Sequence, residues 1–230
     1  MVIDPDRDAL LEGVDQSQAA RLAKRISSIP IAVDTIKLQP INRKPGSTNI
    51  MTMGSLHYPP NADGIRWFLQ EVFPLVQKQM PYVTLTVIGK SPPADFIEMA
   101  NESNGAIEVT GFVDELTPYM ERAALMVVPV RAGSGMRVRL LEAFARAMPA
   151  VTTTIGLEGI TATHDKEILI ADTPQTFADE TIRVLQDENL QTRLAENGRF
   201  LAENKYDWQV ALRQMDKVYA EAANTKVSTQ

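Results

Sequence analysis

Residues 129–143 read PVRAGSGMRVRLLEA and join an apolar run to a segment with helical spacing. The pattern predicts a strand, a flexible turn and the start of a helix. Gly133 and Gly135 permit the positive φ values and close backbone approach of such a turn. The first N–H groups of a helix lack internal partners and favour an anion, and Arg137 and Arg139 add forked donors that suit a diphosphate. The stretch therefore predicts a phosphate-binding turn.

The same stretch also has a purely structural interpretation. A helix that begins at Met136 carries an apolar face, which consists of Val138, Leu141, Phe144, Ala145 and Met148. Its other face carries Arg139, Glu142 and Arg146 at the i,i+3 and i,i+4 spacing of solvated ion pairs, each worth roughly a few tenths of a kcal/mol. The local pattern alone does not decide between these interpretations.

Composition excludes several classes of function. The chain has 230 residues, 44% of them hydrophobic, which is enough to bury a full core. It has no cysteine, and its two histidines, His57 and His164, are far apart in sequence, so we expect no metal site. A net charge of −6 argues against nucleic-acid binding. We expect neither a signal peptide nor a membrane span, and hence a cytoplasmic protein, with peripheral association with the inner membrane left open.

Short apolar runs alternate with helical patterns from about residue 49. Strands are expected at 49–55, 83–89, from 107, 124–130, 150–154 and 167–172, and helices from Ile65, over 94–103 and from Met136. After Thr173 the pattern is helical throughout. Strands separated by helices predict an α/β fold with a doubly wound, Rossmann-like parallel sheet that is covered on both faces.

The chain divides into three parts. Residues 1–45 are expected to be the remnant of a preceding domain and its linker, and residues 223–230 a disordered polar tail. Residues 46–222 are expected to form the Rossmann-like domain with its C-terminal helices, in which Trp208 and Met215 pack into the core.

In an open parallel sheet, ligands bind beyond the carboxyl ends of the strands. The loops at these ends are expected at 54–61, 89–93, 111–115, 131–135 and 155–160. The turn that begins at Arg131 is one of them, which favours the phosphate-binding interpretation.

Several consecutive segments together resemble one family. They are MGSLHYPPNADG (53–64), VTLTVIGKSPP (83–93), IEVTGFVDEL (107–116), PVRAGSGMRVRLLEAFARAMPAVTTTIGLEGI (129–160), FADETIRVLQD (177–187) and RFLAENKYDW (199–208). This succession resembles the C-terminal, donor-binding half of group 1 (family 4) glycosyltransferases of the GT-B architecture, from about Ile29 to Tyr219. The resemblance implies that a nucleotide-sugar is bound as a substrate, with no cofactor, and that a hydroxyl acceptor binds a separate N-terminal domain.

The resemblance also assigns roles by position. Gly111, Phe112 and Val113 would border the base, and Glu142 would bind the ribose hydroxyls. The helix start, with Gly135, Met136 and Arg137, would meet the diphosphate. The predicted catalytic residues are Arg137, Arg139 and Glu142. The predicted substrate-binding residues are Gly54, Ser55, His57, Gly111, Phe112, Val113, Arg131, Gly133, Ser134, Gly135, Met136 and Leu140, and no metal ligand is predicted.

The chain departs from the family pattern at two places. Ser134 replaces the first glutamate of the family's glutamate pair, and the arginine and lysine usual after the first strand are absent from residues 55–63. The positive charge for the diphosphate would then come from Arg131, Arg137 and Arg139. A loop histidine such as His57 is more often a surface residue than a ligand contact.

The resemblance implies a retaining glycosyltransferase whose acceptor is a sugar or a lipid-linked hydroxyl, in polysaccharide, lipid or cell-envelope glycan synthesis. Ser134 motivates an alternative, which is an inactive nucleotide-sugar-binding or assembly module with the same fold. A sugar-nucleotide epimerase of GT-B fold is a third and less favoured hypothesis.

Overall fold

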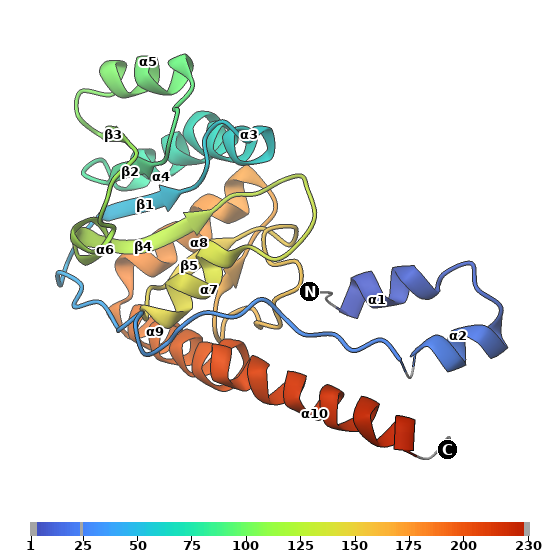
Figure 1. Cartoon of the computed structure of the whole chain (residues 1–230). Coiled ribbons are helices and arrows are strands. Elements are labelled where there is room, and N and C mark those ends of the chain that lie inside the picture. Colours follow the sequence, from blue (N-terminus) through green and yellow to red (C-terminus); the bar gives the residue numbers. More distant parts are fainter. Residues whose placement is uncertain (1–3, 24, 228–230) are drawn as a thin grey trace.

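The computed structural model describes residues 4–23 and 25–227. Its centre is a six-stranded parallel sheet with the order β3-β2-β1-β4-β5-β6 (Figure 1). The strands are β1 Asn49–Met53, β2 Thr84–Ile88, β3 Ile107–Gly111, β4 Ala123–Val128, β5 Ala150–Thr152 and β6 Leu169–Ile170. The predicted α/β, doubly wound, Rossmann-like class is confirmed.

The helices connect the strands and extend the chain at both ends. They are α1 Asp4–Leu11, α2 Gln16–Ala23, α3 Pro59–Trp67, η1 Phe68–Val72, α4 Phe73–Gln79, α5 Ala94–Glu102, α6 Thr117–Arg122, α7 Val138–Ala145, α8 Pro174–Gln186, α9 Glu188–Leu201, η2 Ala202–Tyr206 and α10 Trp208–Val227.

Helices cover both faces of the sheet. On one face, the rings of Trp67 and Phe68 pack edge-on against Phe177 of α8, with ring centroids 5.5 and 5.7 Å apart. On the other face, α7 and η2 contribute Phe144 and Tyr206 to a second apolar cluster. All six residues of β4 are buried, as expected for a central parallel strand.

Two connections differ from the prediction. The helical pattern from Ile65 is not one regular helix, because the π-helical turn η1 separates α3 from α4. Pro74 lies at the start of α4 and has no backbone N–H to continue the regular ladder. The six-residue helix α6 was not predicted, since so short an element gives little periodicity.

The segment before the sheet is bound to the domain. Val33 donates its N–H to Tyr206 O at 2.8 Å and accepts from Trp208 N–H at 3.0 Å. Thr35 donates its N–H and hydroxyl to Asp207 Oδ2, at 3.1 and 2.6 Å. Part of the predicted 1–45 remnant therefore packs against the junction of η2 and α10.

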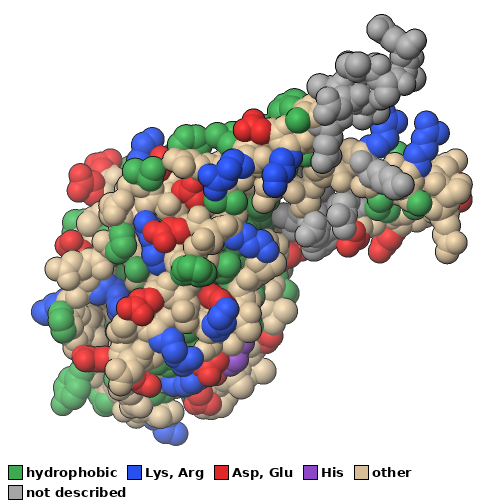
Figure 2. Space-filling view, turned by 90° about the horizontal axis from the view of Figure 1, so that it is seen from below, with side chains coloured by type: hydrophobic (Ala, Val, Ile, Leu, Met, Phe, Trp, Pro, Cys, Tyr) green, Lys and Arg blue, Asp and Glu red, His purple; other side chains and the backbone are tan. Residues whose placement is uncertain are grey.

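The C-terminal helix differs from the prediction in two respects. It continues to Val227, beyond residue 222 where we expected order to end, while residues 228–230 lie outside the described part. The prediction that Trp208 and Met215 are core residues is also wrong, because Trp208 is 41% exposed and Met215 is half-buried. Figure 1 shows α10 running along the outside of the domain, and Figure 2, viewed from that side, shows apolar, basic and acidic side chains intermixed.

Candidate functional site

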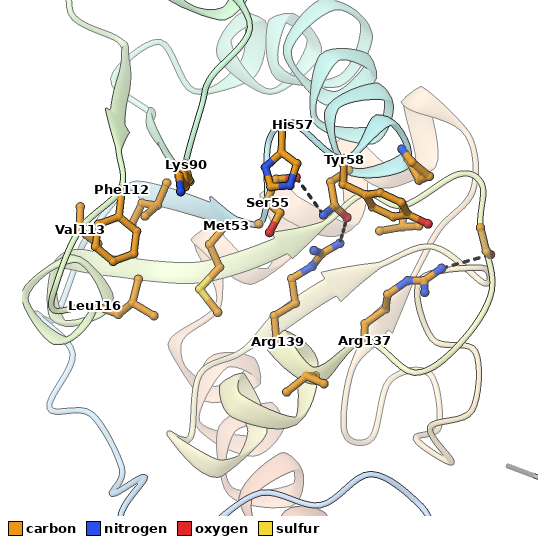
Figure 3. Close-up of a pocket in the computed structure, with 18 of the residues that line it drawn as sticks. Met53, Ser55, His57, Tyr58, Lys90, Phe112, Val113, Leu116, Arg137 and Arg139 are labelled. Atoms are coloured by element: carbon orange, nitrogen blue, oxygen red, sulfur yellow. Dashed lines mark hydrogen bonds between the residues drawn. The ribbon is translucent and has the colours of Figure 1, made fainter. Parts of the chain in front are cut away.

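A cavity of about 600 Å³ opens at the carboxyl ends of β1, β2, β3 and β4 (Figure 3). Backbone hydrogen bonds hold these strand ends together: Gly54 N–H donates to Ile88 O at 3.0 Å, and Gly89 N–H donates to Gly111 O at 2.9 Å. The residues that line it are Met53, Gly54, Ser55, His57, Tyr58, Pro60, Asn61, Ile88, Gly89, Lys90, Phe112, Val113, Leu116, Val130, Gly133, Met136, Arg137, Val138 and Arg139. Nine predicted site residues are among them.

Arg139 extends from the first turn of α7 into the cavity. Its Nη2 donates to Asn61 Oδ1 at 3.0 Å, and no other hydrogen-bond partner of this guanidinium occurs in the described residues. Burial, and next the neighbouring Arg137 guanidinium, lower the pKa of Arg139 to about 10. A half-satisfied, partly desolvated cation of this kind is well suited to an anionic ligand.

Gly54 lies directly against Arg139. A Cβ at residue 54 would come within 2.9 Å of Arg139 Nη1 and 3.3 Å of Asn61 Nδ2. The predicted contact residues Ser55 and His57 follow in the same loop, and both line the cavity. The absence of a side chain at residue 54 therefore leaves room for the guanidinium.

Arg137 is folded back onto its own turn, although it also lines the cavity. Its guanidinium donates to Ser134 O at 2.8 Å, to Gly135 O at 2.6 Å and to Gly133 O at 3.1 Å. Its Nε is buried without a partner. In this conformation Arg137 stabilises the turn, which contrasts with the predicted free donor for a diphosphate.

The turn itself has the predicted backbone. Gly133 and Gly135 have φ values of +97° and +92°. The helix, however, begins at Val138 rather than at Met136, because Arg137 is extended with φ −91° and ψ 93°. The Gly135 N–H, which was expected to meet the diphosphate, donates instead to Glu158 Oε2 at 2.8 Å. A carboxylate from the loop after β5 thus occupies one predicted anion position.

Several other predicted contacts lie outside the cavity. Arg131 is exposed and stacks on Trp67, 5.4 Å from the ring centroid, and Ser134 is exposed. Gly111 ends β3 with φ +72°, next to the lining residue Phe112. Arg131 and Ser134 therefore do not contribute to the cavity surface in this structure.

Two predicted residues on α7 are also placed differently. Leu140 is fully buried in the core, so the prediction that it contacts substrate is wrong for this conformation. Val138 is 40% exposed and lines the cavity, although the helical pattern predicted a core residue. Leu140 therefore faces the core, and Val138 faces the cavity.

Glu142 is half-buried and is not among the residues that line the cavity. Burial raises the pKa of its carboxyl, against the opposing effect of Arg146. The described residues include no ion pair between Glu142 and either Arg139 or Arg146, so the structure does not contain the predicted solvated charge ladder. The role of Glu142 at the ribose stays a prediction.

Sequence reasoning missed residues at both ends of the cavity. Tyr58 ends the first loop and Asn61 lies in the first turn of α3. At the other end, Leu116, Met53 and Ile88 join Phe112 and Val113 in an apolar surface. Lys90 was also missed, although it lies in the loop expected at 89–93. Its position directly after the glycine that ends a predicted strand was the available signal.

The charge of the cavity has a single sign. Its lining includes Lys90, Arg137 and Arg139, and no aspartate or glutamate. Nor do the described residues contain any group of three or more His, Cys, Asp or Glu side chains that could hold a metal ion. The arrangement favours a ligand with an apolar or planar end and an anionic end.

The chain belongs to the family described as Glycosyl transferases group 1, which it matches over residues 47–187. It is also similar to a Klebsiella pneumoniae protein described as an uncharacterized 44.6 kDa protein in the cps region, with 27% identity over 165 residues. That match covers 69% of this chain and 42% of the relative.

Solved structures show the same fold. The C-terminal domain of LpcC, a group 1 family glycosyl transferase from Francisella tularensis, has a TM-score of 0.64 and 21% identity, and covers 76% of this chain and 99% of that domain. TarM from S. aureus has a TM-score of 0.74 and 16% identity, over 95% of this chain and 43% of TarM. The fold is that of the C-terminal domain of GT-B glycosyltransferases.

The chain thus spans less than half the length of the Klebsiella relative and of TarM. Among the described residues, no helix is both long enough and apolar enough to cross a membrane.

Proposed function

We propose that this chain is the donor-binding half of a retaining glycosyltransferase. It binds a nucleoside-diphosphate sugar in the cavity, and the sugar passes to a hydroxyl acceptor in polysaccharide, lipid or cell-envelope glycan synthesis. The observation that carries this proposal is the cavity at the strand ends, which has three basic side chains, no acidic one and an apolar surface beside them.

The chemistry of each end supports a nucleotide ligand. A diphosphate is a compact anion that gains charge-assisted hydrogen bonds from Arg139 without displacing a protein carboxylate from that side chain. Phe112 is 71% exposed at the apolar end, which leaves its ring available to a planar base. The TarM structure, whose fold is similar, was determined with UDP and alpha-GlcNAc-glycerol.

In the proposed reaction, the bond from the anomeric carbon to the diphosphate breaks and a bond to the acceptor oxygen forms. The departing diphosphate oxygen gains negative charge and takes up the proton that the acceptor hydroxyl releases. Arg139 is held in place by α7 and Asn61, so it stabilises that charge without reorganising. We propose no divalent metal or other cofactor, and retention is the outcome that the family resemblance implies.

The alternative is a binding or assembly module that retains the fold without turnover. It is favoured by Ser134, which is exposed and outside the cavity lining where the family pattern has a glutamate. Expression of the chain joined to an acceptor domain, with a radiolabelled nucleotide-sugar, separates the two hypotheses, because transfer excludes the inactive module. Conversion of the donor without an acceptor would indicate an epimerase instead.

Calorimetric titration with UDP, GDP and ADP tests the proposal directly. We expect at least one of the three diphosphates to bind the chain. Arg139→Met should weaken its binding free energy by roughly 1.5–3 kcal/mol, the value of a hydrogen bond to a charged group. If none of the three binds, while circular dichroism shows a folded protein, the proposed function is wrong.

A further inference from the structure

Lys90 is the first residue after Gly89, at the carboxyl end of β2, and it lines the cavity. Its backbone is fixed on two sides. Leu56 N–H donates to Lys90 O at 3.3 Å, and the preceding Gly89 N–H donates to Gly111 O at 2.9 Å. The side chain therefore starts from a defined point between the loops that follow β1 and β3.

The ammonium of Lys90 has no hydrogen bond, ion pair or aromatic ring contact with any residue that the structure describes. The three arginines near the cavity all have protein partners: Arg137 bonds three carbonyls, Arg139 bonds Asn61, and Arg131 lies on Trp67. Lys90 is thus the lining cation whose donors are all available to a ligand.

The cavity residues follow an order that matches the parts of a nucleotide. In Figure 3, Phe112 and Val113 lie at one side, Arg139 and Arg137 lie at the other, and Lys90 lies between Phe112 and the loop residue Ser55. A nucleoside diphosphate that places its base on the apolar side and its terminal phosphate near the arginines has its inner phosphate in the middle. That inner phosphate is the one joined to the ribose.

We infer that Lys90 binds the inner phosphate of the nucleotide, as a residue distinct from Arg139, to which the outer phosphate is assigned. This inference rests on the proposed function. An ammonium is a compact charge with three donors, which suits the non-bridging oxygens of one phosphate. Residues 55–63 contain no lysine or arginine, so the loop after β1 supplies no competing cation. The loop after β2 therefore supplies a positive charge that the loop after β1 does not contain.

Dissecting the ligand tests the assignment. UDP, GDP and ADP are titrated first, to find which base the chain binds. The nucleoside, the nucleoside monophosphate and the nucleoside diphosphate of that base are then compared, with ligand-observed NMR for the weaker ligands. Lys90→Met should weaken monophosphate and diphosphate by the same factor, about 10- to 100-fold, and leave the nucleoside unchanged. Arg139→Met should weaken the diphosphate more than the monophosphate.

Two further variants serve as controls. Lys90→Arg keeps the charge and should retain most of the affinity, while Lys78→Met removes an exposed lysine of α4 and should change nothing. Thermal unfolding confirms that each variant folds.

Each outcome has one meaning. An equal loss for monophosphate and diphosphate supports the inference. A loss for the diphosphate alone, a loss that includes the nucleoside, or no loss overturns it and leaves the proposed function intact. If the unmodified chain binds none of the three diphosphates, the proposed function fails and this inference fails with it.

Discussion

At the scale of single residues, Arg139 combines a cost in folding with a benefit in binding. Its pKa is lowered from the ordinary value of an arginine to about 10, chiefly by burial, so folding makes the charged form less favourable, although the side chain is charged at neutral pH. Since the group binds more protons in the unfolded chain between these values, its contribution to stability rises with pH there. At neutral pH the cation is an unfavourable element of the ligand-free protein.

This cost predicts opposite effects of one substitution. Arg139→Met removes a partly desolvated charge and keeps most of the apolar stem, so the ligand-free variant should unfold at an equal or higher temperature than the parent chain. Its diphosphate affinity should fall by about tenfold or more. Differential scanning calorimetry with and without UDP measures both. A variant with clearly lower thermal stability would show that Arg139 is needed for the fold.

Gly54 provides a second test of the same guanidinium. Gly54→Ala introduces a Cβ that must displace Arg139 Nη1 or Asn61 Nδ2, both at the flexible ends of side chains. We expect little change in stability and a diphosphate affinity reduced by about three- to tenfold, because a displaced donor loses its alignment. Calorimetric titration gives the result, and an unchanged affinity would show that the position of Arg139 is not important for binding.

At the scale of elements, the sequence predicted much of the site because strand, turn and helix signals are local. The alternation of apolar runs located β1 to β4, and the positive φ of Gly133 and Gly135 follows from the residue type. Side-chain direction was not predictable in the same way. Arg137 bonds the carbonyls of its own turn, and Leu140, which was predicted to contact substrate, is buried in the core.

Lys90 and Glu158 illustrate the same limit. Their importance depends on which loops meet at the end of the sheet: Lys90 lies in the cavity between Phe112 and Ser55, and Glu158 reaches Gly135 from the loop after β5. These contacts join residues that are distant in sequence. A single sequence identifies the loops but not which side chains fill the space between them.

The junction between residues 33–38 and α10 is an element whose stability should depend on pH. Burial raises the pKa of Asp207, but hydrogen bonds from the Thr35 hydroxyl and from the Gln209 and Thr35 N–H groups outweigh it and lower the value below 3.8. A lowered carboxyl pKa stabilises the fold above the unfolded-state value, and this contribution is lost as the pH falls through the folded-state value.

Asp207→Asn should therefore be less stable than the parent chain at pH 7 by about 1–3 kcal/mol, because the hydrogen bonds to Thr35 and Gln209 lose their charge assistance. The difference should shrink once the pH is lowered beneath 3.8, the ordinary value for this carboxyl. Urea unfolding at a series of pH values measures it. Asp216→Asn, at an exposed position on α10, is the matched control, and a difference independent of pH would contradict the assigned cause.

At the scale of the whole molecule, the sheet order explains where the cavity forms. The strand order reverses between β1 and β4, so the loops after these strands lead to opposite faces and leave a crevice between them. Gly54 and Asn61 lie on the β1 side of the crevice, and Arg139 reaches them from the β4 side. A ligand in the cavity therefore contacts both halves of the sheet and should stabilise them together.

This connection predicts a thermal shift for the entire chain. A diphosphate at 100 times its dissociation constant stabilises the folded state by about 2.7 kcal/mol, which raises the unfolding temperature of a chain of this size by roughly 5–11 °C. The variants separate binding from folding: Arg139→Met should lose most of the shift, whereas Asp207→Asn should start from a lower temperature and keep the full shift. Differential scanning fluorimetry with UDP, GDP and ADP gives the comparison. A shift that persists undiminished in Arg139→Met would place the ligand outside the cavity.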